Sequence, residues 1–169
     1  MAIMTGERHE RVFCFRIQLC SKNPESRQGR IQGQVSGESK ELSRAGWDKV
    51  LEPGCGTGVM RGGRQPEIAQ CGQIVLSDLS AGMLEAAKTT LKAYDRMECR
   101  IIDIQAIPYE DAGFDFVIAN MMLYHVPDLK KGLSEVRRVL KPGGAFCCAT
   151  YGEHDIIFDS GIFELIMQS

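Results

Sequence analysis

The sequence lacks several features that would assign it to a large functional class. Its formal net charge is −2, so it has no surplus of Lys and Arg of the kind that DNA- and RNA-binding domains carry. It contains no apolar run approaching the roughly 18 residues of a membrane-spanning helix, and no signal-peptide pattern follows Met1. These absences predict a protein without nucleic-acid or membrane partners.

The seven cysteines also lack any spacing that is typical of a metal site. No Cys-x-x-Cys pair occurs, and no cysteine lies at ligand spacing from a histidine. Several cysteines fall inside apolar runs, where a reduced thiol packs like a small hydrophobic side chain. The pattern predicts free thiols in a reducing compartment, hence a cytoplasmic protein without a bound metal.

The usual phosphate-binding motifs are missing as well. Residues 54–58 read Gly-Cys-Gly-Thr-Gly, and the dinucleotide motif Gly-x-Gly-x-x-Gly would need its third glycine at Val59. No Gly-Lys-Ser/Thr is present, which excludes a P-loop. Glu52, just before the glycines, would repel a pyrophosphate but attract an ammonium or sulfonium group. The segment therefore favours a cationic, amino-acid-like cofactor over a dinucleotide.

What the sequence does contain is an alternation of strand and helix patterns. Apolar runs predict strands over residues 49–52, 73–78, 98–103, 114–120 and 145–150. Helices are expected over residues 57–69, 80–94, 128–141 and 159–167, with Ser80 as an N-cap and a Pro-Gly-Gly turn at residues 142–144. This order predicts a Rossmann-like α/β fold: a parallel sheet of about five strands with helices on both faces.

The length of 169 residues suggests a single folded domain. Residues 1–46 form an N-terminal segment of uncertain structure, in which residues 11–19 resemble a strand and residues 21–40 have the composition of a loop. Residues 47–169 are expected to form the ligand-binding domain.

Three of the predicted strands end in an acidic residue: Glu52, Asp78 and Asp103. The carboxyl ends of parallel strands meet at one edge of a sheet, where ligands bind in open α/β folds. One carboxylate there can accept both hydroxyls of a ribose, and another can accept the amino group of adenine. Beside a glycine loop that lets a ligand approach the backbone, the three acids predict a cradle for a positively charged nucleoside.

Four segments in this order, residues 50–58, 76–84, 103–116 and 123–144, resemble the class I S-adenosylmethionine-dependent methyltransferases. The similarity is greatest to the small-molecule branch that includes the ubiquinone- and menaquinone-biosynthesis type, and it spans residues 47–151. It implies S-adenosylmethionine as cofactor, S-adenosylhomocysteine as product, and transfer of a methyl group to a small-molecule acceptor by in-line displacement. The acceptor, and whether O, N or C is methylated, stay open.

The resemblance also implies a set of cofactor-binding residues near the carboxyl ends of the strands: Glu52, Gly54, Cys55, Gly56, Gly58, Asp78, Leu79, Met83, Asp103, Ile104, Asn120 and Met121. The glycine loop would lie under the methionine part of the cofactor, with Glu52 near its ammonium group. Asp78 would bind the ribose hydroxyls, and Asp103 the adenine amino group beside the backbone of Ile104. Leu79 and Met83 would pack on the adenine.

The residues that follow the fourth strand would lie near the reacting methyl group. By the resemblance, Asn120 and Met121 flank the sulfonium, and no residue is assigned as catalytic. His125 is the nearest candidate for a general base, since its ordinary pKa is close to neutral; Tyr124 is a weaker one. The run Asn120-Met121-Met122 is not the Asn-Pro-Pro-Tyr of DNA-adenine and glutamine methyltransferases, which argues against those acceptors.

The sequence departs from the family after the fifth predicted strand. The family fold normally continues with a helix and two more strands, whereas this sequence ends at Ser169 without that pattern. A five-stranded sheet would leave the fifth strand as an apolar edge, so self-association through that edge is expected. Two other functions stay open: a cofactor-binding fragment without turnover, and, less favoured by the glycine spacing, a nicotinamide-dependent oxidoreductase.

Overall fold

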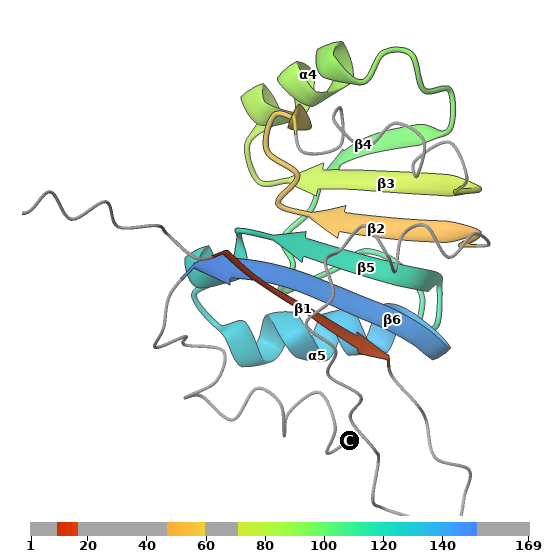
Figure 1. Cartoon of the computed structure of the whole chain (residues 1–169), viewed down its shortest axis with the longest axis vertical. Helices are drawn as coiled ribbons and strands as arrows, with labels where there is room; N and C mark the ends of the chain where they lie inside the picture. Colours follow the sequence, from red (N-terminus) through yellow and green to blue (C-terminus); the bar gives the residue numbers. More distant parts are fainter. Residues whose placement is uncertain (1–9, 17–46, 60–70, 152–169) are drawn as a thin grey trace, which may run out of the picture.

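The computed structural model describes residues 10–16, 47–59 and 71–151, in which six strands form one sheet (Figure 1). The strand order is β1-β6-β5-β2-β3-β4. The strands are β1 (Glu10–Arg16), β2 (Lys49–Pro53), β3 (Gln73–Asp78), β4 (Met97–Ile101), β5 (Phe114–Asn120) and β6 (Leu140–Tyr151). β2 to β6 are mutually parallel, which confirms the predicted five-stranded parallel sheet, and β1 adds a sixth strand antiparallel to β6.

Helices cover both faces of the sheet, as predicted. On one face α5 (Leu129–Val139) contributes Leu133 and Val136 to a core that contains Leu51 and Val117. On the other face α4 (Ala81–Thr90) contributes buried residues to a second core built on the alternate strand positions: Leu84 and Ala87 from the helix and Val50, Ile74, Phe116 and Ile118 from the strands. Successive residues of a strand point to opposite faces, so each central strand supplies apolar side chains to both cores.

The order of the strands creates a crevice beside β2. The chain proceeds from β2 to β3 and β4 on one side, and then returns to place β5 and β6 on the other. Between β2 and β5 the direction of winding therefore reverses. Ligands of open α/β sheets bind outside the carboxyl ends of the strands at such a point.

Both described α-helices begin at a side-chain cap. The Ser80 Oγ accepts a hydrogen bond from the Met83 N–H at 3.3 Å, which confirms the predicted cap of α4. The Asp128 Oδ1 does the same for the Lys131 N–H at 2.9 Å and starts α5. Each cap satisfies one of the free N–H groups of a first helical turn.

Helix α4 is shorter than the sequence predicts. It ends at Thr90 rather than near residue 94. The hydroxyls of Thr89 and Thr90 donate hydrogen bonds at 3.0 Å to the carbonyls of Glu85 and Ala86, four residues earlier. Such back-bonding, together with two consecutive β-branched side chains, weakens the end of a helix.

Two strand boundaries also correct the prediction. β4 ends at Ile101, so Asp103 lies in the loop two residues beyond the strand rather than at its last position. β6 begins at Leu140, before the expected turn. Leu140 pairs with Phe114 and Ala145 with Phe116, so four residues of β6 (141–144) lie opposite a single residue of β5, Asp115. Residues 142–144 are thus a bulge inside the strand, with Gly143 in the left-handed region at φ 79°.

The edge of β6 is not exposed, contrary to the prediction. β1 pairs along it from Glu10 to Arg16, opposite Tyr151 to Ala145. The argument for self-association through that edge is therefore wrong. The partner strand comes from a segment about 130 residues earlier in the chain, where the sequence predicts only a possible strand.

The prediction that all cysteines are free thiols is also wrong. Cys147 of β6 is disulfide-bonded, whereas Cys55, Cys71, Cys99 and Cys148 are free. The residue opposite Cys147 in the register is Cys14 of β1.

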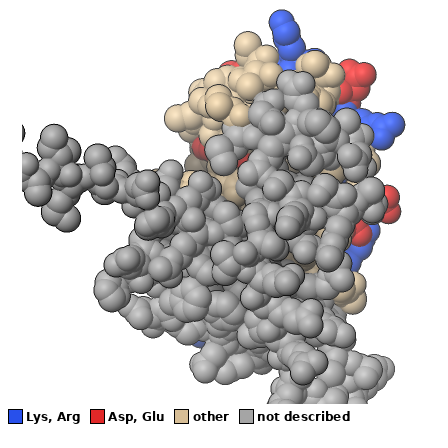
Figure 2. Space-filling view, in the orientation of Figure 1, with Lys and Arg blue, Asp and Glu red and all other residues tan. Residues whose placement is uncertain are grey.

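Other predictions concern parts of the chain outside the described residues. Most of the helix expected over residues 57–69, all of that over residues 159–167, and most of the N-terminal segment 1–46 lie there. No helix within the described ranges has the length and apolar character needed to cross a membrane. On the face shown in Figure 2, the visible acidic and basic side chains are interspersed along one side of the described part.

Candidate functional site

A cavity of about 330 Å³ opens at the carboxyl ends of β2, β3, β4 and β5. Its volume falls in the range of small-molecule sites. The wall contains residues at the ends of these four strands or in the segments that follow them: Pro53, Gly54, Gly56, Asp78, Leu79, Ser80, Met83, Ile102, Asp103, Ile104, Gln105, Met121, Met122, His125, Val126 and Pro127. The cavity therefore occupies the crevice that the strand order creates.

The cavity wall brings together eight of the twelve residues that the sequence predicts for cofactor binding: Gly54, Gly56, Asp78, Leu79, Met83, Asp103, Ile104 and Met121. The remaining four are buried and do not line the cavity: Glu52, Cys55, Gly58 and Asn120. Only 2% of Glu52 and 7% of Asn120 is exposed. Of the predicted three-carboxylate cradle, two carboxylates therefore line the cavity, whereas the third, that of Glu52, is buried and outside the lining.

Asp78 holds the glycine loop in place. Its Oδ2 accepts a hydrogen bond from the Gly56 N–H at 3.0 Å, and its Oδ1 accepts one from the Ser80 N–H at 2.9 Å. A carboxylate offers about four acceptor positions, so each oxygen keeps one for a ligand. Asp78 thus both shapes the loop and presents a doubly accepting group to the cavity.

All three glycines of the loop adopt positive φ angles: 65° at Gly54, 56° at Gly56 and 73° at Gly58. Other residues rarely adopt this conformation. At Gly54 space is restricted too, because an added Cβ would lie 2.6 Å from the Met122 Cβ. The loop after β2 therefore packs directly on the segment after β5, which closes the floor of the cavity.

Replacing Gly54 by alanine is expected to destabilise the fold by about 2–4 kcal/mol, because left-handed strain adds to overpacking against Met122. Gly143→Ala is the control, since its φ is also positive but an added Cβ there meets no atom within 4 Å. Chemical denaturation of both variants measures the difference. Equal losses would show that contact with Met122 contributes nothing.

The segment after β5 forms the opposite wall. Met121 adopts φ 51°, a strained conformation for a residue other than glycine, and leads into the short 3-10 helix η2 (Leu123–His125). This turn brings Met121, Met122 and His125 to the cavity. The ring of Tyr124 contacts the His125 ring at a centroid distance of 4.3 Å, and both side chains are exposed. His125 is thus the titratable imidazole next to the cavity, as expected for a candidate base.

Sequence reasoning missed several residues of the wall, among them Gln105, Met122, Val126 and Pro127. Gln105 follows Asp103 by two residues, and the other three follow the end of β5 within seven residues. A systematic inspection of every residue between a strand end and the next helix would have found them. The chemistry of Met122, Val126 and Pro127 alone gives no signal, since apolar side chains in loops are common.

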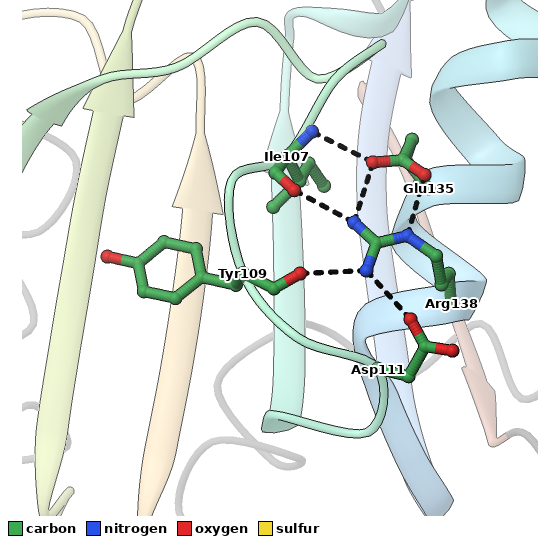
Figure 3. A network of polar contacts seen from close by, with 5 residues as sticks. All are labelled: Ile107, Tyr109, Asp111, Glu135 and Arg138. Atoms are coloured by element: carbon green, nitrogen blue, oxygen red, sulfur yellow. Dashed lines mark hydrogen bonds and ion pairs between the residues drawn. The ribbon is translucent and has the colours of Figure 1, made fainter.

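The loop that carries Asp103 is fastened to α5 by Arg138 (Figure 3). The guanidinium donates to the carbonyl oxygens of Ile107 at 2.8 Å and Tyr109 at 2.7 Å, and to carboxylate oxygens of Asp111 and Glu135. Glu135 in turn accepts from the Ile107 N–H at 2.9 Å. The position of the cavity wall near Asp103 therefore depends on a polar network outside the cavity.

Cys55 lies inside the glycine loop but is chemically inert. Burial, followed by the negative charges of Glu52 and Asp78, raises the pKa of its thiol to about 12. Since the thiolate is the nucleophile, Cys55 cannot serve in covalent catalysis near neutral pH. The effect of Glu52 on this pKa also shows that its charge is felt at the loop.

At about pH 8, Cys55 is expected to react with iodoacetamide roughly a thousand-fold more slowly than a thiol of ordinary pKa, because its thiolate fraction is lower by that factor. Mass spectrometry of timed alkylation of the folded protein measures the rate, and the same reaction in denaturant is the control. Rapid labelling of Cys55 without unfolding would contradict the assignment.

Among the described residues, no group of three or more His, Cys, Asp or Glu side chains is arranged to hold a metal ion. The polar groups of the residues that line the cavity are carboxylates, an amide, an imidazole, a hydroxyl and backbone groups. This set suits a ligand with hydroxyl and amino donors.

Comparisons with known proteins agree with this geometry. The family described as Methyltransferase domain matches residues 51–148, more than half of the chain. Demethylmenaquinone methyltransferase of Staphylococcus saprophyticus is 33% identical over 109 residues, which are 64% of this chain and 47% of the relative. The protein of the same name from Staphylococcus aureus (strain MRSA252) is 34% identical over 59% of this chain and 42% of the relative. The chain thus spans less than half the length of these relatives.

Solved structures show the same fold. The trans-methyltransferase CalH, crystallised with S-adenosylhomocysteine, has a TM-score of 0.52 and 31% identity, over 56% of this chain and 29% of CalH. A putative methyltransferase from Bacillus halodurans has a TM-score of 0.60 over 76% of this chain and 59% of that one, at 22% identity, and so supports the fold alone. From the family match, the relatives and the strand order, the chain belongs to the class I S-adenosylmethionine-dependent methyltransferases.

Proposed function

We propose that the chain binds S-adenosylmethionine in the cavity and transfers its methyl group to a small-molecule acceptor. One observation carries the proposal: the carboxylates of Asp78 and Asp103 line one cavity beside a loop of left-handed glycines. Together they offer acceptors for the ribose and for the base, and a backbone that a ligand can approach closely. Family membership makes the cofactor the expected ligand of this arrangement.

The proposed roles follow from where each group lies. Asp78 accepts from the ribose hydroxyls with the positions that Gly56 and Ser80 leave open. Asp103 accepts from the adenine amino group, next to the backbone of Ile104. The methionine part lies over the glycine loop, where the buried Glu52 contributes negative charge from beneath rather than by direct exposure.

The apolar rim of the cavity fits a flat aromatic base. Leu79 is 68% exposed and Met83 44% exposed, although both are large hydrophobic side chains. Both lie on the cavity wall next to Asp78. An adenine stacked on them would bury this surface and gain roughly 25 cal/mol for each Å² removed from water.

The cofactor, when bound, supplies an activated methyl group and a good leaving group, so the protein mainly aligns the reactants. Alignment of this kind can lower a barrier by about 7–11 kcal/mol. In the proposal, Met121 lies beside the sulfonium, and His125 is placed to accept a proton from the acceptor where the reaction requires it. Asn120, buried behind Met121, supports that wall without lining the cavity.

For the acceptor we propose an apolar, quinone-type ring. The relatives named above are demethylmenaquinone methyltransferases. The wall after β5 offers apolar surface of a matching kind, from Met121, Met122, Val126 and Pro127. These contacts do not determine whether carbon or oxygen is methylated; identification of the reaction product does.

Calorimetry with S-adenosylhomocysteine and with NAD tests cofactor binding directly. Micromolar binding of S-adenosylhomocysteine without binding of NAD is the expected result; neither the family match nor the relatives support the nicotinamide alternative. A methyl-transfer assay with reduced quinones and a panel of small metabolites then tests turnover. Cofactor binding without any product would favour a binding module, and absence of cofactor binding would refute the proposal as a whole.

A further inference from the structure

We propose that Gln105 is a positioning residue that fixes the orientation of Asp103 and so determines which purine base the cavity accepts. Gln105 lies in the loop after β4 and on the cavity wall. The inference rests on the proposed function, because it concerns the same nucleoside site. It assigns a role to a side chain that the cofactor-binding set does not contain.

The Gln105 side chain is held at both ends. Its Nε2 donates to both oxygens of Asp103, at 3.1 Å and 3.2 Å, and its Oε1 accepts from the Asp128 N–H at 3.0 Å. Rotating the amide by half a turn would place its oxygen against the carboxylate and its NH₂ against a backbone N–H. Both contacts would then be repulsive, so the network permits one orientation of the amide.

This arrangement leaves a particular oxygen of Asp103 for a ligand. The Oδ1 accepts from the Gln105 N–H at 2.8 Å as well as from Nε2, so both of its acceptor positions are engaged. Among the described residues, the Oδ2 accepts only from Nε2, which leaves its second position for a ligand. A base that carries an amino group can donate to that position, whereas a base with a carbonyl there would bring two acceptors together. The orientation thus favours adenine over hypoxanthine.

The same amide connects the base site to the opposite wall. Asp128, whose N–H it binds, is the N-cap of α5 and directly follows Val126 and Pro127 of the cavity wall. Gln105 therefore ties the loop after β4 to the segment after β5 from within the cavity. Loss of the amide frees both Asp103 and the start of α5.

A Gln105→Glu substitution tests the role through its pH dependence. At about pH 7.5 the new carboxylate faces that of Asp103, and two carboxylates in contact cannot both stay ionised without repulsion. We expect affinity for S-adenosylhomocysteine to fall about ten-fold or more, since a charge-assisted contact is replaced by a like-charge one. Two carboxylates in contact favour uptake of a proton as the pH falls. Once protonated, the new carboxyl group can donate to Asp103 while its carbonyl accepts from the Asp128 N–H, so affinity should recover when it is measured at about pH 5.5.

The other titratable groups near Asp103 and residue 105 are the same in the wild type and in its variants. Asp78 and His125 line the cavity, Asp128 begins α5, and Glu135 and Arg138 lie against the following part of the loop. Comparing the affinity of each variant with that of the wild type at the same pH removes their contribution. Gln105→Met, of similar size but without polar atoms, should lose affinity at both pH values.

A matched control is Gln73→Glu. Gln73 also donates to a carboxylate, that of Glu98 at 3.4 Å, but it is exposed and lies at the start of β3, at the opposite end of the strand from the cavity. Its substitution should leave ligand affinity unchanged at both pH values. Thermal melts of all variants separate loss of fold from loss of binding.

The readout is calorimetric affinity for S-adenosylhomocysteine and for its analogue in which a carbonyl replaces the adenine amino group. Preference for the amino compound should be large in wild type, small in Gln105→Met, and recovered at low pH in Gln105→Glu. If wild type binds neither compound, the proposed function fails and this inference with it. If wild type binds and prefers the amino compound while Gln105→Glu keeps that preference at pH 7.5, only the role of Gln105 is overturned.

Discussion

Replacing Asp78 by alanine is expected to weaken binding of S-adenosylhomocysteine by at least about two orders of magnitude. Two hydroxyl donors would lose a charged acceptor, and each such bond contributes about 1.5–3 kcal/mol. The Gly56 and Ser80 N–H groups would lose their acceptor as well, so the glycine loop would no longer be held against the cavity. Isothermal titration calorimetry with the purified variant measures the loss.

Asp95→Ala provides the control, because Asp95 is an exposed aspartate that lies outside the cavity wall. It should bind like wild type. Asp78→Asn should fall between wild type and Asp78→Ala, since its amide keeps one acceptor atom but turns an NH₂ group toward one of the two backbone donors. Unchanged affinity in Asp78→Ala would remove the ribose assignment, whatever the behaviour of Asp103.

Where a segment's structure is decided locally, the sequence predicted it correctly. β3 and β5 have the predicted bounds, because each is an apolar run that ends at a polar residue and is covered on both faces. Ser80 is the cap of α4, and Asp128, the first residue of the helix predicted over residues 128–141, proves to be the cap of α5. In both, an oxygen of the side chain reaches an N–H three residues later.

Features that depend on distant segments were missed. The pairing of β1 with β6 joins residues 129 to 141 positions apart, and Cys147 of β6 is disulfide-bonded. The bulge at residues 142–144 was predicted as a turn, because proline and two glycines indicate a break in both cases. Only the pairing partner, Phe114–Phe116 of β5, shows that the strand continues through it.

The sequence predicted those parts of the candidate site whose positions follow from the order of the parallel strands. Parallel strands that end together bring Asp78 and Asp103 to one cavity, even though Asp103 lies beyond its strand. The direction of Glu52 could not be read from the sequence, since every residue from 50 to 53 of this central strand is buried and no alternation distinguishes its faces. Gln105 acts through the conformation of a loop, which leaves no periodic pattern.

Replacing Arg138 by methionine is expected to lower the free energy of unfolding by about 2–4 kcal/mol. Each of the five N–H donors of this guanidinium has an acceptor: two carbonyl oxygens, two oxygens of Glu135 and one of Asp111 (Figure 3). Arg138 is about one-third exposed, so the ion pairs contribute less than buried ones would. Most of the loss comes from the carbonyls of Ile107 and Tyr109, which lose a charged donor that fixes the loop after Asp103. Arg138→Lys should recover little, since an ammonium cannot reach four groups in this planar arrangement.

The loss of unfolding free energy in Arg138→Met should depend on pH, and the direction of that dependence shows whether Glu135 contributes to it. The hydrogen bonds from Arg138 hold the pKa of Glu135 below its usual value of 4.5. A carboxyl group with a lowered folded-state pKa stabilises the fold above its unfolded pKa, and that contribution disappears as pH falls through the folded value. The gap between wild type and Arg138→Met in urea denaturation should therefore be largest near neutral pH and narrow in acid. Lys130→Met, at an exposed position of the same helix, should differ little from wild type at any pH. A gap that stays constant down to strongly acidic pH would assign the whole effect to the two carbonyls and none to Glu135.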